Sequence, residues 1–332
     1  MLSTPSERST TAAAAVPAAT GGPAIAVVLP CYNEEVAIGR TIADFRAALP
    51  TAQIYVFDNN SSDGSRTIAR AAGAIVRIES RQGKGNVVRR MFADVDADIY
   101  VMADADATYE ARAAPAMVAK LLDENLDMVV GRRLDQVDAA YRPGHRLANV
   151  MLTRCLAAMF GRQFTDILSG YRVFSKRFVK TFPSWSSGFE IETEISVHAL
   201  QLRMPVGEVE TRYDARPEGS TSKLGTYRDG LRICWQMFTL FRQERPIAFF
   251  GIMGTVLALL AIVLAIPLGI TYSQTGLVPR LPTAVLCTGL MILAVLAMTC
   301  GLILDTVTRG RLEVRRLAYL GWHPPTLTRL DA

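Results

Sequence analysis

Two long stretches without a charged residue constrain the fold of this 332-residue chain more than any other feature. Ile247 to Ile270 and Leu281 to Leu304 each contain 24 residues and no Asp, Glu, Lys or Arg. About 20 apolar residues are enough to cross the hydrocarbon core of a bilayer. Two core helices of a soluble domain are the alternative, but such helices need other segments to cover all their faces. We therefore predict two transmembrane helices.

Basic residues flank these stretches unequally. Arg242 and Arg245 precede the first stretch and four arginines follow the second, whereas the connecting segment 271–280 holds one basic residue. Cytoplasmic loops are enriched in Lys and Arg, so both termini and the polar part of the chain are expected in the cytoplasm. The sequence thus predicts an integral protein of the inner, or cytoplasmic, membrane. Self-association through the two helices stays open.

The chain before these stretches has the pattern of an α/β domain. Residues 1–23 are a low-complexity tail of Ser, Thr, Ala, Pro and Gly without a signal-peptide core, and we expect them to be disordered. From Ala24 onward, apolar runs of strand length alternate with helix-period segments, which predicts a doubly wound, mostly parallel sheet. The strands are expected at 25–29, 53–57, 74–78, 99–103 and 127–130, and the helices near Glu34, Ser65, Gly85, Arg112 and Arg146. Asp63 and Ser62 would cap the second helix.

The predicted domains follow from changes in composition. A loop rich in Gly, Ser and Pro, 216–225, ends a domain that spans 24–225. Aromatic and aliphatic residues then recur at helical spacing in 226–245, directly before the first apolar stretch, which favours an interfacial amphipathic helix. The two-helix membrane region would cover 246–308 and a cytoplasmic tail 309–332. Five scattered cysteines indicate neither a zinc site nor a disulfide framework.

The motif Asp104-Ala105-Asp106 follows a predicted buried strand. Carboxylates at the carboxyl end of a parallel strand point at the crevice where an open α/β sheet binds its ligand. Carboxylate oxygens suit Mg²⁺ or Mn²⁺. A divalent cation there would neutralise a diphosphate leaving group, as a transferase that uses sugar nucleotides requires. An isolated Asp-x-Asp is most often a solvated turn, so the interpretation depends on the other motifs.

Three further segments place polar residues at the ends of strands or at helix starts. Residues 27–35 run from a strand through Pro30 and Asn33 to Glu35, residues 57–65 place Asp58 at a second strand end, and Gly83-Lys84-Gly85 opens a helix. The last motif, with Asp104 downstream, imitates a dinucleotide-binding fingerprint. Val88 stands where the third glycine would be, and the motif follows the third strand rather than the first, which disfavours an oxidoreductase.

In this order the motifs resemble glycosyltransferase family 2, over Ala24 to roughly Gly225. More narrowly, Thr165 to Arg172, Gly188-Phe189-Glu190 and Gly219 to Leu224 resemble the branch of dolichol-phosphate mannose synthase and polyprenyl-phosphate sugar transferases. The resemblance implies a glycosyltransferase A-type, Rossmann-like fold. It also implies a nucleotide site at Pro30, Asn33, Glu35, Asp58, Lys84 and Asp104, a metal at Asp104 and Asp106, and a reaction centre at Asp166.

Departures from the family pattern affect specificity. Asn59-Asn60 stands where a second acid followed by glycine is frequent, and Ala107-Thr108 follows the Asp-x-Asp. Base selectivity and the remaining metal ligands therefore stay open. The Gln-x-x-Arg-Trp signature of processive polysaccharide synthases is absent from the sequence, which favours transfer of a single sugar.

The resemblance to this branch implies that the acceptor is a polyprenyl phosphate, and the two membrane segments agree with it, because a polyprenyl tail stays in the bilayer. A lipid monophosphate with a second pKa near ~6 is largely dianionic at cytosolic pH and needs no protein base. Positively charged side chains must then hold the acceptor phosphate. The candidates, from loops or helix starts, are Arg133, Arg146, Arg216 and Lys223, and the Ser169 hydroxyl of the branch motif is a further candidate.

The predicted activity is thus a metal-dependent, inverting transfer of one sugar from a nucleotide sugar to a polyprenyl phosphate at the cytoplasmic membrane face. Two alternatives stay open: a glycosyltransferase with a glycan or glycolipid acceptor, and a non-catalytic membrane scaffold that binds sugar nucleotides. No nucleic-acid partner is expected.

Overall fold

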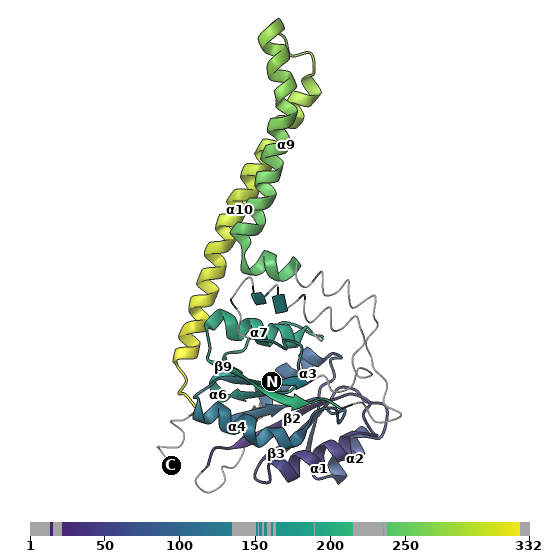
Figure 1. The fold of residues 1–332 in the computed structure, drawn as a ribbon. Helices are drawn as coiled ribbons and strands as arrows, with labels where there is room; N and C mark the ends of the chain where they lie inside the picture. Colours follow the sequence, from purple (N-terminus) through teal and green to yellow (C-terminus); the bar gives the residue numbers. More distant parts are fainter. Residues whose placement is uncertain are drawn as a thin grey trace, which may run out of the picture. The chain divides into compact units, whose positions relative to one another are not determined.

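The computed structural model describes residues 14–15, 22–134, 151, 153–154, 156–157, 161, 164–188, 190–214, 235 and 238–325. The chain divides into two compact units, one formed by residues 1–229 with 316–332 and the other by residues 230–315. The first unit holds an α/β sheet and the second holds most of two long apolar helices (Figure 1).

A seven-stranded sheet forms the centre of the first unit, in the order β4-β3-β2-β6-β8-β7-β9. Strand β8 pairs antiparallel with both of its neighbours, and every other pair is parallel. The strands are β2 (Ile25–Cys31), β3 (Gln53–Asp58), β4 (Ile75–Ile78), β6 (Ile99–Met102), β7 (Met128–Leu134), β8 (Arg172–Ser175) and β9 (Val206–Arg212). Two short strands, β1 (Ala14–Ala15) and β5 (Val95–Asp96), pair separately.

Helices cover both faces of this sheet (Figure 1). They are α1 (Ile38–Ala48), α2 (Ser65–Ala71), α3 (Lys84–Asp94), the 3-10 helix η1 (Ala111–Ala113), α4 (Ala114–Asp123), α6 (Lys176–Thr181) and α7 (Ile191–Leu202). On one face, Val27 and Val101 of the strands pack with buried residues of α1, α2 and α4. On the other, Phe174 of β8 meets Phe92 of α3 and Phe178 of α6. This two-sided cover explains the nearly continuous apolar strands β2, β3 and β6.

The predicted doubly wound, mostly parallel α/β sheet is confirmed, and all five predicted strands are present within a few residues. One helix start is wrong: α1 begins at Ile38 rather than near Glu34. The N–H groups of Glu34 and Glu35 instead donate to the side chains of Ser65, the first residue of α2, and of Asp63 before it. Strands β8 and β9 were not predicted. The predicted helix start at Arg146 and most of 216–245 lie outside the described residues.

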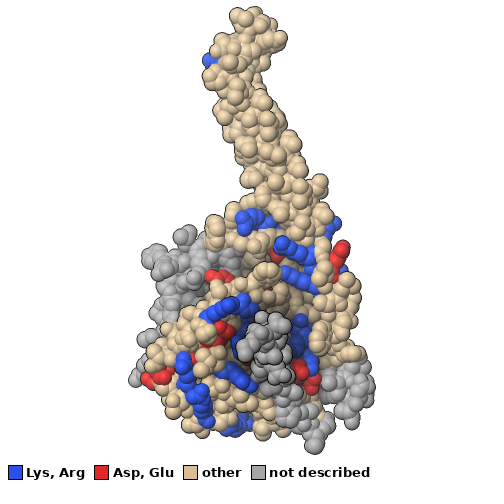
Figure 2. Space-filling view, turned by 180° about the vertical axis from the view of Figure 1, so that it is seen from behind, with Lys and Arg blue, Asp and Glu red and all other residues tan. Residues whose placement is uncertain are grey.

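The second unit contains two helices long and apolar enough to cross a membrane. Helix α9 (Pro246–Thr275) has a mean hydropathy of 2.7, and α10 (Leu281–Leu320), which ends in the first unit, has 2.4, each over its most apolar window. The space-filling view shows almost no charged side chains along most of this helical part (Figure 2). Small residues let the helices approach: a Cβ on Gly254 of α9 would lie 2.9 Å from the Ala294 carbonyl oxygen of α10.

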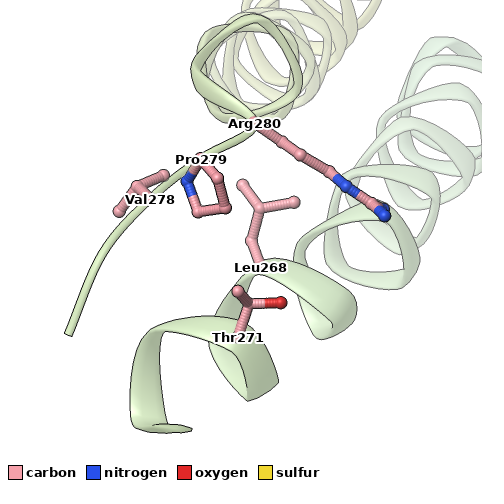
Figure 3. A pocket seen from close by; sticks show the side chains of 5 residues that line it. All are labelled: Leu268, Thr271, Val278, Pro279 and Arg280. Atoms are coloured by element: carbon pink, nitrogen blue, oxygen red, sulfur yellow. The ribbon is translucent and has the colours of Figure 1, made fainter. Parts of the chain in front are cut away.

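A small pocket lies where α9 gives way to the segment before α10. Leu268 and Thr271 of α9 face Val278, Pro279 and Arg280 across it (Figure 3). The lining contains one hydroxyl and one guanidinium group and no carboxylate. The aspartates singled out from the sequence, Asp58, Asp104, Asp106 and Asp166, all belong to the first unit.

Candidate active site

The carboxyl ends of β3, β2, β6 and β7 lie at one edge of the sheet, because these strands run in the same direction. Asp58 ends β3 in register with Cys31 of β2, and Asp104 and Asp106 follow β6. Arg133 lies near the end of β7. The strand-end residues that the sequence singled out are therefore brought to the same side of the sheet, where open α/β folds bind ligands.

Asp58 is fully buried, and its two carboxylate oxygens differ in their hydrogen bonding. Oδ2 accepts from Arg66 Nε at 2.6 Å and from the Ser61 N–H at 3.2 Å. Oδ1 has no hydrogen-bond partner within the described part of the chain. Buried polar atoms are almost always satisfied in native proteins, so Oδ1 is an acceptor suited to a ligand N–H or O–H group.

Two other predicted nucleotide residues connect the loops after β2 and β3. Asn33, at a positive φ of 52°, accepts the Ser62 N–H through Oδ1 at 2.8 Å. The Glu35 carboxylate accepts the Gly64 N–H at 2.8 Å. Pro30 lies within β2, paired with Phe57. The structure thus gives Asn33 and Glu35 a role in shaping the loops, and their contact with a nucleotide stays a prediction.

The helix that follows these loops begins as predicted, but its cap differs in detail. The Asp63 carboxylate accepts the Ser65 N–H at 3.0 Å, next to the first turn of α2. The Ser62 hydroxyl donates to Asn33 Oδ1 at 3.4 Å instead of accepting an N–H of the helix. Asp63 alone therefore provides the side-chain contact expected at this helix start.

Lys84, the first residue of α3, lies between two carboxylates. Its Nζ donates to Asp104 Oδ1 at 2.5 Å and lies 2.6 Å from Glu192 Oε1 of α7. Burial on its own would lower the pKa of Lys84, but the Asp104 and Glu192 charges outweigh it and raise the pKa above the ordinary value. The ammonium group therefore stays charged at physiological pH. Sequence reasoning missed Glu192, whose only local signal is its place among the acids that open α7.

The glycines around Lys84 have a packing explanation. A Cβ on Gly83 would lie 2.0 Å from the Ser187 carbonyl oxygen, and one on Gly85 would lie 2.1 Å from the Ser186 carbonyl oxygen. The Gly85 N–H donates to the Ser187 carbonyl at 3.1 Å. These glycines thus admit the backbone of residues 186–187, which accounts for them without a dinucleotide.

Asp104 and Asp106 are the residues that could hold a divalent metal. Asp106 is buried and its Oδ1 accepts from Thr108 Oγ1 at 2.6 Å, which orients the carboxylate. Among the described residues, no three His, Cys, Asp or Glu side chains form a ready-made metal cluster. Mg²⁺ and similar ions are often bound by one or two carboxylates with substrate phosphates completing the set, so a pair of oxygen donors fits such an ion.

Asp166, the predicted reaction-centre acid, is paired with a predicted acceptor residue. The Arg133 guanidinium group donates to the Asp166 carboxylate from Nε at 2.7 Å and from Nη2 at 2.8 Å, and its backbone N–H donates at 3.3 Å. Ser169 is buried and its Oγ donates to the Gly131 carbonyl at 2.6 Å. Arg146, Arg216 and Lys223 lie outside the described residues, so their roles stay predictions.

Aromatic rings adjoin this ion pair. Tyr213 follows β9 and lies under Arg133, whose Cζ is 5.4 Å from the ring centroid. Tyr109 packs against Tyr213 and accepts the Gly170 N–H through its hydroxyl at 2.9 Å. Burial raises the pKa of Tyr109 well above its ordinary value. Burial also raises the pKa of Tyr213, so both tyrosines are neutral hydrogen-bonding groups, and neither was predicted from the sequence.

Sequence comparison places this chain among glycosyltransferases. The model of the family described as "Glycosyl transferase family 2" matches residues 26–182. Glycosyltransferase AglJ from Haloferax volcanii is 36% identical over 70% of this chain and 76% of its own length. Dolichyl-phosphate hexose transferase from the same organism is 25% identical over 67% of this chain and 95% of its own.

A solved structure also resembles the fold. Glucosyl-3-phosphoglycerate synthase from Mycobacterium tuberculosis, in complex with Mn²⁺, uridine diphosphate and glucosyl-3-phosphoglycerate, superposes with a TM-score of 0.53 and 23% identity. The match covers 66% of this chain and 81% of that one. At this level of identity the likeness establishes the common fold.

Proposed function

Because the chain belongs to glycosyl transferase family 2, we propose that this glycosyltransferase moves a single sugar from a nucleotide sugar to a polyprenyl phosphate at the cytoplasmic face of a membrane. The observation that carries the proposal is the combination, in one chain, of the Asp58–Lys84–Asp104 strand-end site with two helices of membrane-crossing length and hydropathy. The similarity to a dolichyl-phosphate hexose transferase supports the acceptor class.

The donor fits the side of the site formed by β3 and β6. The unpaired Asp58 Oδ1 offers an acceptor to a base or ribose. The Lys84 ammonium faces the place where the diphosphate would lie next to Asp104. A divalent ion held by Asp104 and Asp106 would neutralise the charge of the departing nucleoside diphosphate, and either Mg²⁺ or Mn²⁺ suits these donors. Lys84 would assist by donating to the same leaving group.

The acceptor requires positioning more than activation. A lipid phosphate is already largely dianionic, so one of its oxygens can attack the anomeric carbon as the bond from that carbon to the diphosphate oxygen breaks. Such a single displacement inverts the configuration at that carbon. Arg133 would hold the acceptor phosphate, with Asp166 orienting its guanidinium group through two hydrogen bonds. No residue has to remove a proton.

The membrane segments explain how such an enzyme meets its acceptor. Each buried CH₂ of a lipid chain contributes about 0.8 kcal/mol, so a polyprenyl tail stays in the bilayer and the catalytic unit must work at its surface. Both termini would be cytoplasmic, with residues 271–280 outside. A Ser273→Cys variant should then react with an impermeant maleimide in intact cells. Labelling only after lysis would contradict this topology.

The activity is tested with purified chain in nanodiscs, a panel of labelled sugar nucleotides, undecaprenyl phosphate, and Mg²⁺ or Mn²⁺. We expect one donor to give a lipid product that is cleaved by mild acid, because a sugar phosphodiester is cleaved under these conditions. Undecaprenol without its phosphate and the Asp104→Asn chain serve as controls. An acid-stable product would favour a glycan or glycolipid acceptor, and the absence of any nucleotide release would favour a non-catalytic scaffold.

A further inference from the structure

The two carboxylates that hold Lys84 differ in exposure. The Lys84 side chain is 9% exposed and Glu192 is 7% exposed, whereas Asp104 is 30% exposed. The ammonium group is therefore bonded to an enclosed carboxylate on one side and to a more open one on the other. A ligand that enters the site reaches Asp104 more readily than Glu192.

The backbone of Glu192 is fixed by hydrogen bonds from buried side chains. Glu192 lies in the first turn of α7, and its backbone carbonyl accepts from Arg172 Nη2 at 3.2 Å and from Ser196 Oγ at 3.0 Å. Arg172 is fully buried and also donates to the carbonyls of Ile167 and Ser169. The position of Glu192 is thus fixed by the core, while Asp104 lies in the loop that follows β6.

We propose that Glu192 is a positioning residue that retains Lys84 when Asp104 turns from the lysine to a divalent cation. The inference rests on the proposed metal and donor site and adds a residue to it. Asp104 cannot serve both cations fully, because two positive groups at one carboxylate repel each other. Glu192 gives Lys84 a second partner, so the ammonium group stays beside the diphosphate. Without Glu192, Lys84 would remain on Asp104 and compete with the metal.

The test measures Mn²⁺ binding from the loss of the free-ion electron paramagnetic resonance signal, on the full chain in detergent with UDP present, against a protein-free sample of Mn²⁺ and UDP as the blank. Glu192→Gln should weaken Mn²⁺ binding about 10-fold, which is within the range for residues that support a metal ligand. In a Lys84→Gln background, the same change should alter binding less than about twofold, since the competitor is gone. Glu192→Asp should recover most of the loss.

The control is Glu124→Gln, which removes a carboxylate from the exposed Lys120–Glu124 pair on α4 and should leave Mn²⁺ binding unchanged. An equal loss in both backgrounds would show that Glu192 acts through its charge or as a ligand, and would overturn the positioning role. Undiminished binding in Glu192→Gln would also overturn it. A wild-type chain that bound no Mn²⁺ would refute the metal site itself, whereas Mn²⁺ binding without lipid product would refute only the proposed acceptor.

Discussion

Two clusters of carboxylates lie at opposite ends of the strands of the same sheet, and they differ in how their oxygens are paired and enclosed. At the start of β7, Asp127 accepts from Ser175 Oγ, from Arg177 Nε and Nη2, and from the Tyr319 hydroxyl, all between 2.7 and 2.9 Å. At the other end, Asp104 and Glu192 share the single ammonium group of Lys84.

The difference indicates which cluster is built for a ligand. Asp127 is fully buried, and one arginine matches its charge while four hydrogen bonds surround its two oxygens. At the other site, Asp104 and Glu192 both bind Lys84, the buried Arg172 lies next to Glu192, and Asp104 is partly open. An accessible carboxylate can turn to an incoming cation, whereas an enclosed one with all its partners in place cannot. Burial of a charged group is therefore a weaker sign of function than access to one of its oxygens.

The largest effect is expected from Asp104→Asn, which removes the open carboxylate. Turnover should fall at least about 1,000-fold, near 4 kcal/mol in activation free energy, because charge on the leaving diphosphate is no longer neutralised. The midpoint of thermal unfolding should stay within about 2 °C of the wild type, because Glu192 still pairs with Lys84. Nucleotide release and thermal unfolding of the purified chain measure the two quantities, and Asp106→Asn should behave alike. Near-normal turnover in either variant would refute the metal assignment.

Asp127→Asn should give the reverse pattern, with lost stability and retained catalysis. Removing one partner of a buried ion pair leaves the other charge uncompensated, which costs about 3 kcal/mol. Here Arg177 would lose its carboxylate. Urea unfolding measures the stability, and turnover per folded molecule should stay within about twofold of the wild type. A large fall in turnover with unchanged stability would mean that the two clusters had been assigned the wrong roles.

The sequence predicted the site residues that lie directly after a strand in the chain. Asp58, Asp104 and Asp106 follow their strands directly, so the direction of the strands was enough to bring them to one edge. Strands β8 and β9 escaped prediction because long-range pairing fixes their places: β8 lies between β6 and β7, and β9 pairs with β7. Glu192 is 108 residues from Lys84, and Tyr319 is 192 residues from Asp127. Neither contact can be predicted from a local sequence pattern.

The sequence also could not show that Arg133 and Asp166 bind each other. Each was assigned a separate task, on the acceptor phosphate and at the reaction centre. In the structure they form a bidentate pair 33 residues apart. Asp166 precedes β8, which pairs antiparallel with β7, and a pattern of parallel strands does not anticipate this pairing.

Gly85→Ala tests the packing beside Lys84 and should have an intermediate effect. The added Cβ would lie 2.1 Å from the Ser186 carbonyl oxygen, so the backbone of residues 186–187 must move. Overpacking of this kind costs about 2 kcal/mol, and a displaced Lys84 should also lower turnover. Gly22→Ala is the matched control, because a Cβ there meets nothing within 4 Å. A Gly85→Ala chain as stable and active as the control would mean that residues 186–187 do not fix the start of α3.

The smallest effect is expected from Tyr319→Phe, which removes one of the four hydrogen bonds to Asp127 and leaves a ring for Arg177 to pack against, at 4.3 Å from the centroid. The contact is partly exposed, so the loss should be about 1 kcal/mol at pH 7. Burial, and then the hydrogen bond and charge of Asp127, raise the pKa of Tyr319 above its ordinary value. A group whose pKa is raised by folding contributes its full stabilisation to the folded state below its unfolded-state pKa, which is ~10 for tyrosine. This stabilisation is lost as the pH rises above the unfolded-state pKa.

The difference in unfolding free energy between the wild type and Tyr319→Phe should therefore be flat from pH 6 to about 9 and should shrink above about pH 10. Urea unfolding at pH 7 and at about pH 10.5 measures it, with Tyr272→Phe, an exposed tyrosine of α9, as the control. A difference that grew with pH, or none at pH 7, would mean that the hydroxyl does not serve Asp127. The hydrogen bonds that enclose Asp127 would then come from Arg177 and Ser175 alone, and the contrast between the two carboxylate clusters would depend on these two residues.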